Sequence, residues 1–306
     1  MEKIKTSSHF KLVDALYVLG MILPIVACMV LKVIITPESD GISISGARQL
    51  FEIPMPIQNL PITEAQVNSV AVIIVIFFLC RYFTHGLSIK ANLKRQLIVE
   101  WIVEKTKNLV NANMGEFFRG YEPFIAAIMG ISAFSSLMAL LGLYPPTSDI
   151  NIVGGWAILT FALITYYKLK GGLGNYLKGF TEPIFVMTPL NILGEVATPV
   201  SLAFRHYGNV LSGSVIAVLI ASALQGLSSL LLGWLPGFLG EIPFLQIGIP
   251  AVLSVYFDIF SGCMQAFIFA MLTMLNISGN FPQEEYEKRL LKKQAKKAKK
   301  LKNKTN

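Results

Sequence analysis

The sequence predicts an all-α, polytopic membrane protein with about five to six transmembrane spans. Of the 306 residues, 54% are hydrophobic and only 14% are charged, whereas soluble domains carry about 25% charged residues. The mean hydropathy is correspondingly high, at +0.59. Long apolar runs recur along the chain, and about 20 apolar residues of helix suffice to cross a bilayer. Together these observations argue against a soluble globular fold.

Six apolar runs are candidates for membrane spans. They cover residues 15–35, 67–83, 124–143, 152–167, 184–234 and 243–275. The last two runs are longer than a perpendicular crossing requires, so we expect these helices to tilt, bend or break within the membrane.

Basic residues flank the spans in a regular alternation. Short segments rich in Lys and Arg mark the cytoplasmic side of a membrane. Such residues precede the first span and follow the second, fourth and sixth, whereas the links after the third and fifth spans contain none. The basic flanks comprise Lys3, Lys5, Lys11, Arg81, Lys90, Lys94, Arg95, Lys168, Lys170, Lys178 and a tail at 280–306. The alternation predicts six spans with both termini in the cytoplasm.

The first span leaves two alternatives open. Residues 25–28 (IVAC) follow a basic start and form a passable lipoprotein cleavage site, which would be cut before Cys28. The apolar run nevertheless continues through residues 29–31 (MVL), which favours a retained span. We therefore predict that residues 1–62 form a retained or cleaved N-terminal span and an extracytoplasmic segment. Cleavage would leave five spans in the same orientation.

The sequence contains no pattern of a catalytic, metal-binding or nucleotide-binding site. The three cysteines each lie in an apolar run without metal-ligand or redox spacing, and the three histidines are scattered. A glycine-rich phosphate-binding loop is also missing. We expect no catalytic residue, no metal, no bound cofactor and no nucleic-acid partner.

Arg205 is the most unusual residue of the fifth span. Its neighbours are nearly all apolar, and an ionisable side chain deep in a span costs at least about 2.5–3.5 kcal/mol on insertion scales. A guanidinium group also stays protonated at physiological pH. Arg205 is therefore either a functional charge or a structural one, paired with a neighbouring carbonyl or acid.

Other polar residues share the spans with Arg205. Asn209 lies four residues further on and so occupies the same helix face. Glu195 and Asp258 are the buried acids, and Gln265 follows Asp258 by seven residues. Polar groups at helical spacing suggest a wet path or a polar helix contact. Spacing also allows either acid to neutralise Arg205.

Four motifs give the chain a resemblance to a known family. They are PPTSDIN at 145–151, KGGL at 170–173, PVSLAFRHYGN at 199–209 and QAFIFAMLTM at 265–274. In this order and on these spans they resemble subunit a of bacterial F-type ATP synthases. The resemblance extends over roughly residues 52–276 and implies a membrane core at 63–279.

The resemblance implies a non-catalytic stator subunit that carries ions past a rotating ring of c subunits. The last two spans would form a tilted hairpin against this ring, and Arg205 would face the ring carboxylates. The resemblance places Asn209, Gln265 and Glu195 on the ion path and Asp149 in the outer loop. It also implies two half-channels, a translocated proton or sodium ion, peripheral-stalk b subunits as partners, and the bacterial plasma membrane as location.

Three positions depart from the family pattern. Ser214 stands where many members have an acid, Asp258 where they have a histidine or an acid, and His206 where they have an apolar residue. The acid of the access path is therefore predicted at Asp258. His206 is either a titrating group in that path or a residue in a helix contact.

An alternative function is a secondary ion-coupled transporter with Arg205 and Asp258 at its substrate site. Such transporters commonly show repeated halves, and this sequence shows no repeat. The basic tail at 280–306 is predicted to be a solvated cytoplasmic extension near anionic lipid.

Overall fold

The computed structural model describes residues 8–35, 46–56, 58–88, 94–181, 184–232, 248, 252–253, 255–284, 286–288, 291 and 294. The start of the predicted sixth span, the link before it and most of the basic tail lie outside these residues. The longer elements, in chain order, are α1 (Ser8–Ile35), β1 (Gln49–Ile53), β2 (Leu60–Thr63), α2 (Glu64–Thr84), α3 (Lys94–Met114), α4 (Glu122–Leu137), α5 (Ile150–Lys170), α6 (Leu173–Thr181), α7 (Thr188–Leu232), the π-helix η5 (Val255–Ser261) and α10 (Gly262–Gly279). Short 3₁₀ turns are η1 (Glu116–Tyr121), η2 (Met138–Leu141), η3 (Pro146–Ser148) and η4 (Phe185–Met187).

Six stretches of helix in the described part of the chain are long and apolar enough to cross a membrane. They are Lys11–Ile35, Glu64–Thr84, Glu116–Leu141, Ile150–Lys170, Phe185–Leu231 and Val255–Gly279. This confirms the predicted all-α, multi-span class.

A small β-hairpin lies between α1 and α2 and was not predicted from the sequence. Strands β1 and β2 pair antiparallel, with Glu52 opposite Pro61 and Ile53 opposite Leu60. The strands are only five and four residues long, and Pro61 is unusual in a strand unless that strand lies at an edge. A hairpin this short gives too weak a pattern to be read from the sequence.

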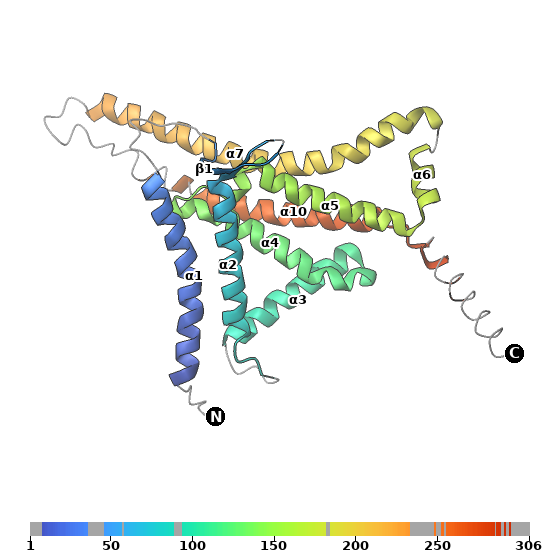
Figure 1. Ribbon diagram of the computed structural model, residues 1–306, viewed down its shortest axis with the longest axis horizontal. Helices are drawn as coiled ribbons and strands as arrows, with labels where there is room; N and C mark the ends of the chain where they lie inside the picture. The colour runs from blue at the N-terminus through green and yellow to red at the C-terminus, as the bar shows by residue number, and fades with distance from the viewer. Residues whose placement is uncertain are drawn as a thin grey trace.

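Helices α1 and α2 run side by side as an antiparallel pair (Figure 1). Cys28 of α1, Ala71 and Val72 of α2 belong to one buried cluster. The helices approach closely at Gly20, where an added Cβ would lie 2.7 Å from the Phe78 ring. The N-terminal span is thus packed against the next one in the described structure, and Cys28 acts as a small apolar residue in that contact.

The second group of helices runs across α1 and α2 at a steep angle (Figure 1). Helix α10 packs between α4 and α5, and α7 lies along α5. The main buried cluster joins these helices with α3, through residues such as Val110, Ile125, Val153 and Phe269. Helix α7 is 45 residues long and contains Pro199, and Figure 1 shows that it is bent. An internal proline favours bending because it removes a helix hydrogen bond.

Helices α4 and α10 approach each other closely at Gly262. A Cβ added there would lie 2.6 Å from the Cβ of Ser136, and small residues allow membrane helices to approach in this way. We expect Gly262→Ala to destabilise the protein by about 1–3 kcal/mol, the usual cost of overpacking. The yield of assembled complex on native gels measures this effect. Gly130→Ala is the matched control, because a Cβ at Gly130 meets nothing within 4 Å; equal yields for both variants would contradict the packing argument.

Lys170, the last residue of α5, lies in a cage of aromatic rings. Its Nζ atom is 4.4 Å from the centre of the Tyr167 ring and 5.0 Å from that of Tyr166. The rings of Phe117 and Tyr286 are each 5.7 Å away. Cation–π contacts of this kind are worth about 0.5–1 kcal/mol each at exposed sites. The described start of the C-terminal tail therefore packs against the ends of α5 and η1. We had predicted the whole tail to be a solvated extension, and these residues differ from that prediction.

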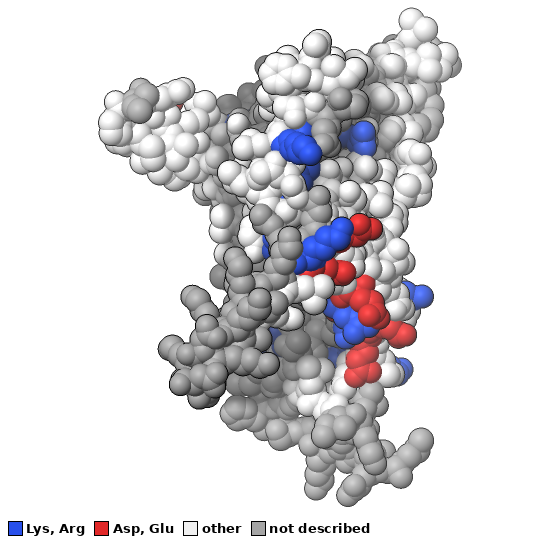
Figure 2. All heavy atoms as spheres, turned by 90° about the vertical axis from the view of Figure 1, so that its right-hand side faces the viewer, with Lys and Arg blue, Asp and Glu red and all other residues white. Residues whose placement is uncertain are grey.

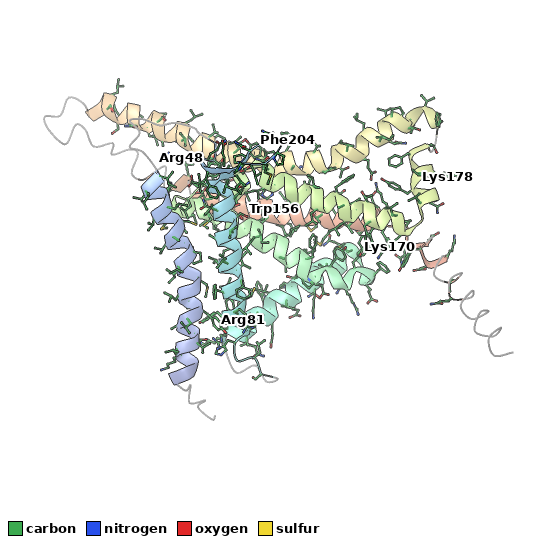
Figure 3. The ribbon with its side chains drawn as sticks, viewed as in Figure 1. Arg48, Arg81, Trp156, Lys170, Lys178 and Phe204 are labelled. Atoms are coloured by element: carbon green, nitrogen blue, oxygen red, sulfur yellow. The ribbon has the colours of Figure 1, made fainter. Side chains whose placement is uncertain are left out.

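Charged side chains gather at the end of the molecule that carries α6. Figure 2 views this end and shows Lys, Arg, Asp and Glu along one stretch of a largely uncharged surface. Figure 3 places Lys170 and Lys178 at this end, Arg81 at the end of α2 near α3, and Arg48 beside β1. The basic residues after α2 and α5 were predicted to face the cytoplasm.

Candidate functional site: the surroundings of Arg205

Arg205 lies on α7 with its side chain exposed. Figure 3 shows that its neighbour Phe204, like Trp156 of α5, lies near the middle of the helices α5, α7 and α10. Among the residues that the structure describes, Arg205 makes no ion pair and no hydrogen bond. The described part of the chain therefore presents a permanent positive charge on the outer surface of a membrane helix.

Asn209 and Gln265 meet across two helices. Asn209 of α7 donates a hydrogen bond from Nδ2 to Oε1 of Gln265 on α10, at 2.7 Å. Gln265 is buried, whereas Asn209 is one turn from Arg205 and exposed like it. The hydrogen bond joins the two candidate residues from separate spans and ties α7 to α10 beside Arg205.

His206 points away from Arg205 into the helix bundle. Its side chain is fully buried, and its Nε2 atom lies 3.3 Å from Oγ of Ser132 on α4. The ring edges of Trp156 and Phe269 complete its surroundings, with T-shaped contacts. The structure thus places His206 in a contact between α7, α4, α5 and α10.

Glu195 forms an ion pair with Lys168. Oε2 of Glu195 on α7 lies 2.6 Å from Nζ of Lys168 at the end of α5, and the two side chains are only 13% and 21% exposed. The hydroxyl of Tyr176 on α6 donates to Oε1 of Glu195 at 3.5 Å. The possibility that Glu195 neutralises Arg205 is therefore not realised in this structure.

Two adjoining hollows lead from the α6 end of the molecule to Arg205. The first, of about 550 Å³, is lined by Glu195, Lys168 and Tyr176 among others. The second, of about 320 Å³, is lined by Ser201 and Arg205. Gly194 and Thr198 belong to the walls of both hollows. The two hollows thus follow one another along α7 between the α5–α6 corner and Arg205, and we refer to them together as the passage.

A third hollow lies on the other side of Arg205, toward the C-terminal end of α7. It has a volume of about 80 Å³, and its walls include Asn209, Ser214, Ser136 and Asp258. Asp258 comes from the π-helix η5, which precedes α10. Ser214 and Asp258, two of the three positions that depart from the family pattern, thus lie on the same hollow.

Asp149 is the N-cap of α5. Its Oδ1 atom accepts a hydrogen bond from the backbone N–H of Asn151 at 2.9 Å, and its side chain is largely buried. Oδ2 accepts a weaker hydrogen bond from Thr63 at 3.4 Å. These contacts give Asp149 a structural role, because an N-cap residue satisfies a free backbone donor of the first helical turn. It does not line any of the three hollows.

A comparison with known protein families identifies the family to which the chain belongs. A family model described as ATP synthase A chain matches residues 66–278. The chain belongs to the ATP synthase subunit a family. It is accordingly a non-catalytic, ion-translocating membrane subunit of an F-type ATP synthase, and the catalytic activity resides in other subunits. This membership leaves no support for the alternative of a secondary transporter.

Curated members of the subunit a family are similar over most of their length. The ATP synthase subunit a of Macrococcus caseolyticus is 31% identical over 217 residues, which are 67% of this chain and 84% of that protein. That of Priestia megaterium is 32% identical over 236 residues, covering 72% and 94%. The ATP synthase subunit a of Propionigenium modestum, described as sodium ion specific, is 26% identical over 275 residues, covering 79% and 88%.

Sequence reasoning missed three residues that contribute to the surroundings of the site. Lys168 was interpreted only as a basic flank of a span, and Tyr176 and Ser132 were not singled out. Their partners lie 27, 19 and 74 residues away along the chain. Spacing within one helix carries no information about such contacts, so only the folded structure reveals them.

Proposed function

We propose that Arg205 faces the carboxylates of a ring of c subunits and that the hollows beside it are the two half-channels of the ion path. The exposed, unpaired position of Arg205 within the described structure carries this proposal. A charge on the lipid-facing side of a span needs a partner, since its insertion into lipid is costly. A ring carboxylate supplies the opposite charge.

The electrostatics of Arg205 accounts for ion transfer. An adjacent positive charge favours the ionised form of a carboxylate, so a ring site that arrives with its ion bound releases the ion next to Arg205. The same guanidinium group, always protonated, repels a cation that would pass directly from one hollow to the other. Ions must therefore travel with the ring, and the membrane potential contributes about 2.3 kcal/mol per charge per 100 mV to its rotation.

The two half-channels are assigned from the polar residues on either side of Arg205. One comprises the adjoining hollows with Glu195, Thr198 and Ser201, which open toward the α5–α6 corner. The other comprises the hollow with Ser214 and Asp258. Asn209 lies in the wall of this hollow, and its hydrogen bond to Gln265 joins α7 to α10. The translocated ion is a proton or sodium, selected mainly by the ring, and no resident cofactor takes part.

ATP-driven ion pumping in inverted membrane vesicles tests this proposal. Pumping should be lost when Arg205 is replaced by alanine and retained when Arg119 is replaced. Arg119 is an exposed arginine paired with Glu116 at 2.8 Å and lies outside the hollows, so its replacement controls for loss of one positive charge.

The partners and orientation follow from the same assignment. We place the c-ring against α7 and α10, the peripheral-stalk b subunits beside the remaining spans, and the whole subunit as a multi-pass protein in the bacterial plasma membrane. The basic flanks after α2 and α5 put both of these helix ends in the cytoplasm.

A tag fused to the C-terminus should be inaccessible in right-side-out vesicles and become accessible when the membrane is permeabilised. Labelling of this tag with an impermeant reagent measures its side directly. A tag inserted between β1 and β2 is the matched control and should be labelled from outside. Labelling of the C-terminal tag in intact vesicles would reverse the proposed orientation.

A further inference from the structure

The ion pair between Lys168 and Glu195 occupies the wall of the passage that leads to Arg205. Both side chains line the hollow of about 550 Å³, and their charged atoms are 2.6 Å apart. Lys168, Glu195 and Tyr176 are the only ionisable side chains among the described residues that line it. Any cation that enters this hollow therefore encounters a Glu195 carboxylate that is already paired with the ammonium group of Lys168.

Tyr176 completes the surroundings of the carboxylate. Burial, and to a lesser extent the neighbouring Glu195 carboxylate, raises the pKa of Tyr176 above its usual value. Its phenol thus remains a neutral donor to Oε1 of Glu195. Lys168 is the one positive charge that the described residues place beside Glu195, and its long side chain can swing aside without moving the backbone.

We propose that Lys168 is a built-in competitor for the translocated cation at Glu195. When the passage is empty, the ammonium group of Lys168 pairs with the Glu195 carboxylate. An ion that enters from either end displaces this ammonium group, and the ammonium group later displaces the ion. The competition keeps the residence time of the ion at Glu195 short. This inference rests on the proposed ion path and names Lys168 as a positioning residue of its α6-side branch.

The physical reason is that a shielded carboxylate does not remain without a positive partner. An ionised group shielded from water is costly unless it is paired. With Lys168 present, the ion pair satisfies this requirement. The translocated ion then gains only the difference in free energy between its own contact with Glu195 and the contact of Lys168 with Glu195. Without Lys168, the full attraction goes to the translocated ion, which then binds more tightly and leaves more slowly.

The test is passive ion flux through the membrane sector, assembled with its b and c partners in liposomes and driven by a potassium diffusion potential. The coupling ion is varied on the α6 side in complexes with Lys168→Met, Lys168→Arg or Lys178→Met. For Lys168→Met we expect the half-saturating ion concentration to fall about tenfold and the maximal flux to fall as well. For a proton, this is a shift of the half-saturation point by about one unit to higher pH.

The two other variants are the controls. Lys168→Arg keeps the charge beside Glu195, and Lys178→Met removes one positive charge from exposed α6 at the same end of the molecule. Both should show the half-saturation of the unaltered complex. A Lys168→Met complex with unchanged half-saturation, whatever its maximal flux, would overturn the inference, because a purely structural ion pair changes only the amount of working complex.

Failure of this inference can be told apart from failure of the proposed function. ATP-driven pumping is measured in parallel for Arg205→Ala in liposomes that contain the whole complex, including the soluble sector. Loss of coupling in that variant together with unchanged half-saturation in Lys168→Met would refute the role of Lys168 alone. Normal coupling with Arg205→Ala would refute the ion path on which the inference rests.

Discussion

Replacing Arg205 with alanine should abolish ATP-driven ion pumping while the soluble sector continues to hydrolyse ATP. Loss of a positioned charge from a functional site typically lowers a rate by a hundredfold or more, so pumping should fall by at least about a hundredfold. The reason is that the ring carboxylates would no longer be driven to release their ion when they pass this subunit. Acidification of inverted vesicles, or sodium uptake by them, measures the rate.

A second measurement sharpens this prediction. On the proposed ion path Arg205 also separates the two half-channels, so its removal should increase passive ion leak through the membrane sector. Arg205→Lys keeps a positive charge but not the planar, always-protonated guanidinium group, and we expect it to recover only part of the pumping. Arg119→Ala should behave like the unaltered complex. Normal coupled pumping by Arg205→Ala would show that Arg205 is only a structural charge.

Replacing Asp258 with asparagine should lower ion flux on the order of a hundredfold, the usual contribution of a positioned group that transfers a proton. Asp258 is the only acid among the described residues that line the hollow beyond Asn209. Its replacement would leave this branch of the path without a carboxylate to accept the ion. Both ATP-driven pumping and ATP synthesis should fall, because they use the same branch in opposite directions.

The rescue experiment for Asp258 uses its neighbour on the same hollow. Adding Ser214→Asp to Asp258→Asn returns a carboxylate to the hollow, and we expect ion flux to recover at least in part. Glu284→Gln, a change of an exposed acid after α10, should leave flux unaffected. Undiminished flux in Asp258→Asn alone would remove Asp258 from the path. A double variant without recovery would mean that position 214 does not reach the ion.

The spans could be predicted from the sequence because an apolar length is a local property. The predicted run at 67–83 became Glu64–Thr84, and the run at 152–167 became Ile150–Lys170. The excess length of the fifth run correctly indicated the long, bent helix α7. Only the ends were displaced, since polar residues such as Glu64 and Lys170 extend a helix beyond the apolar run.

The contacts of the candidate site could be predicted only in part. The shared face of Arg205 and Asn209 followed from their spacing, and the hydrogen bond from Asn209 to Gln265 joins two residues that the family motifs had already singled out. The partner of Glu195 could not be found in this way, because Lys168 lies on another helix. The N-cap role of Asp149 could have been predicted, because Asp directly before a helix is a common N-cap. The family motif instead led us to place Asp149 in the outer loop.

The aromatic cage around Lys170 has a mechanical consequence. A stator subunit beside a rotating ring experiences torque, and a flexible stator would lose part of the work of each rotation step as its own deformation. Rings from η1, α5 and the segment after α10 surround one lysine, so three separate parts of the chain share a single anchor. On the proposed stator role, we expect this anchor to stiffen the far end of α10 against twisting.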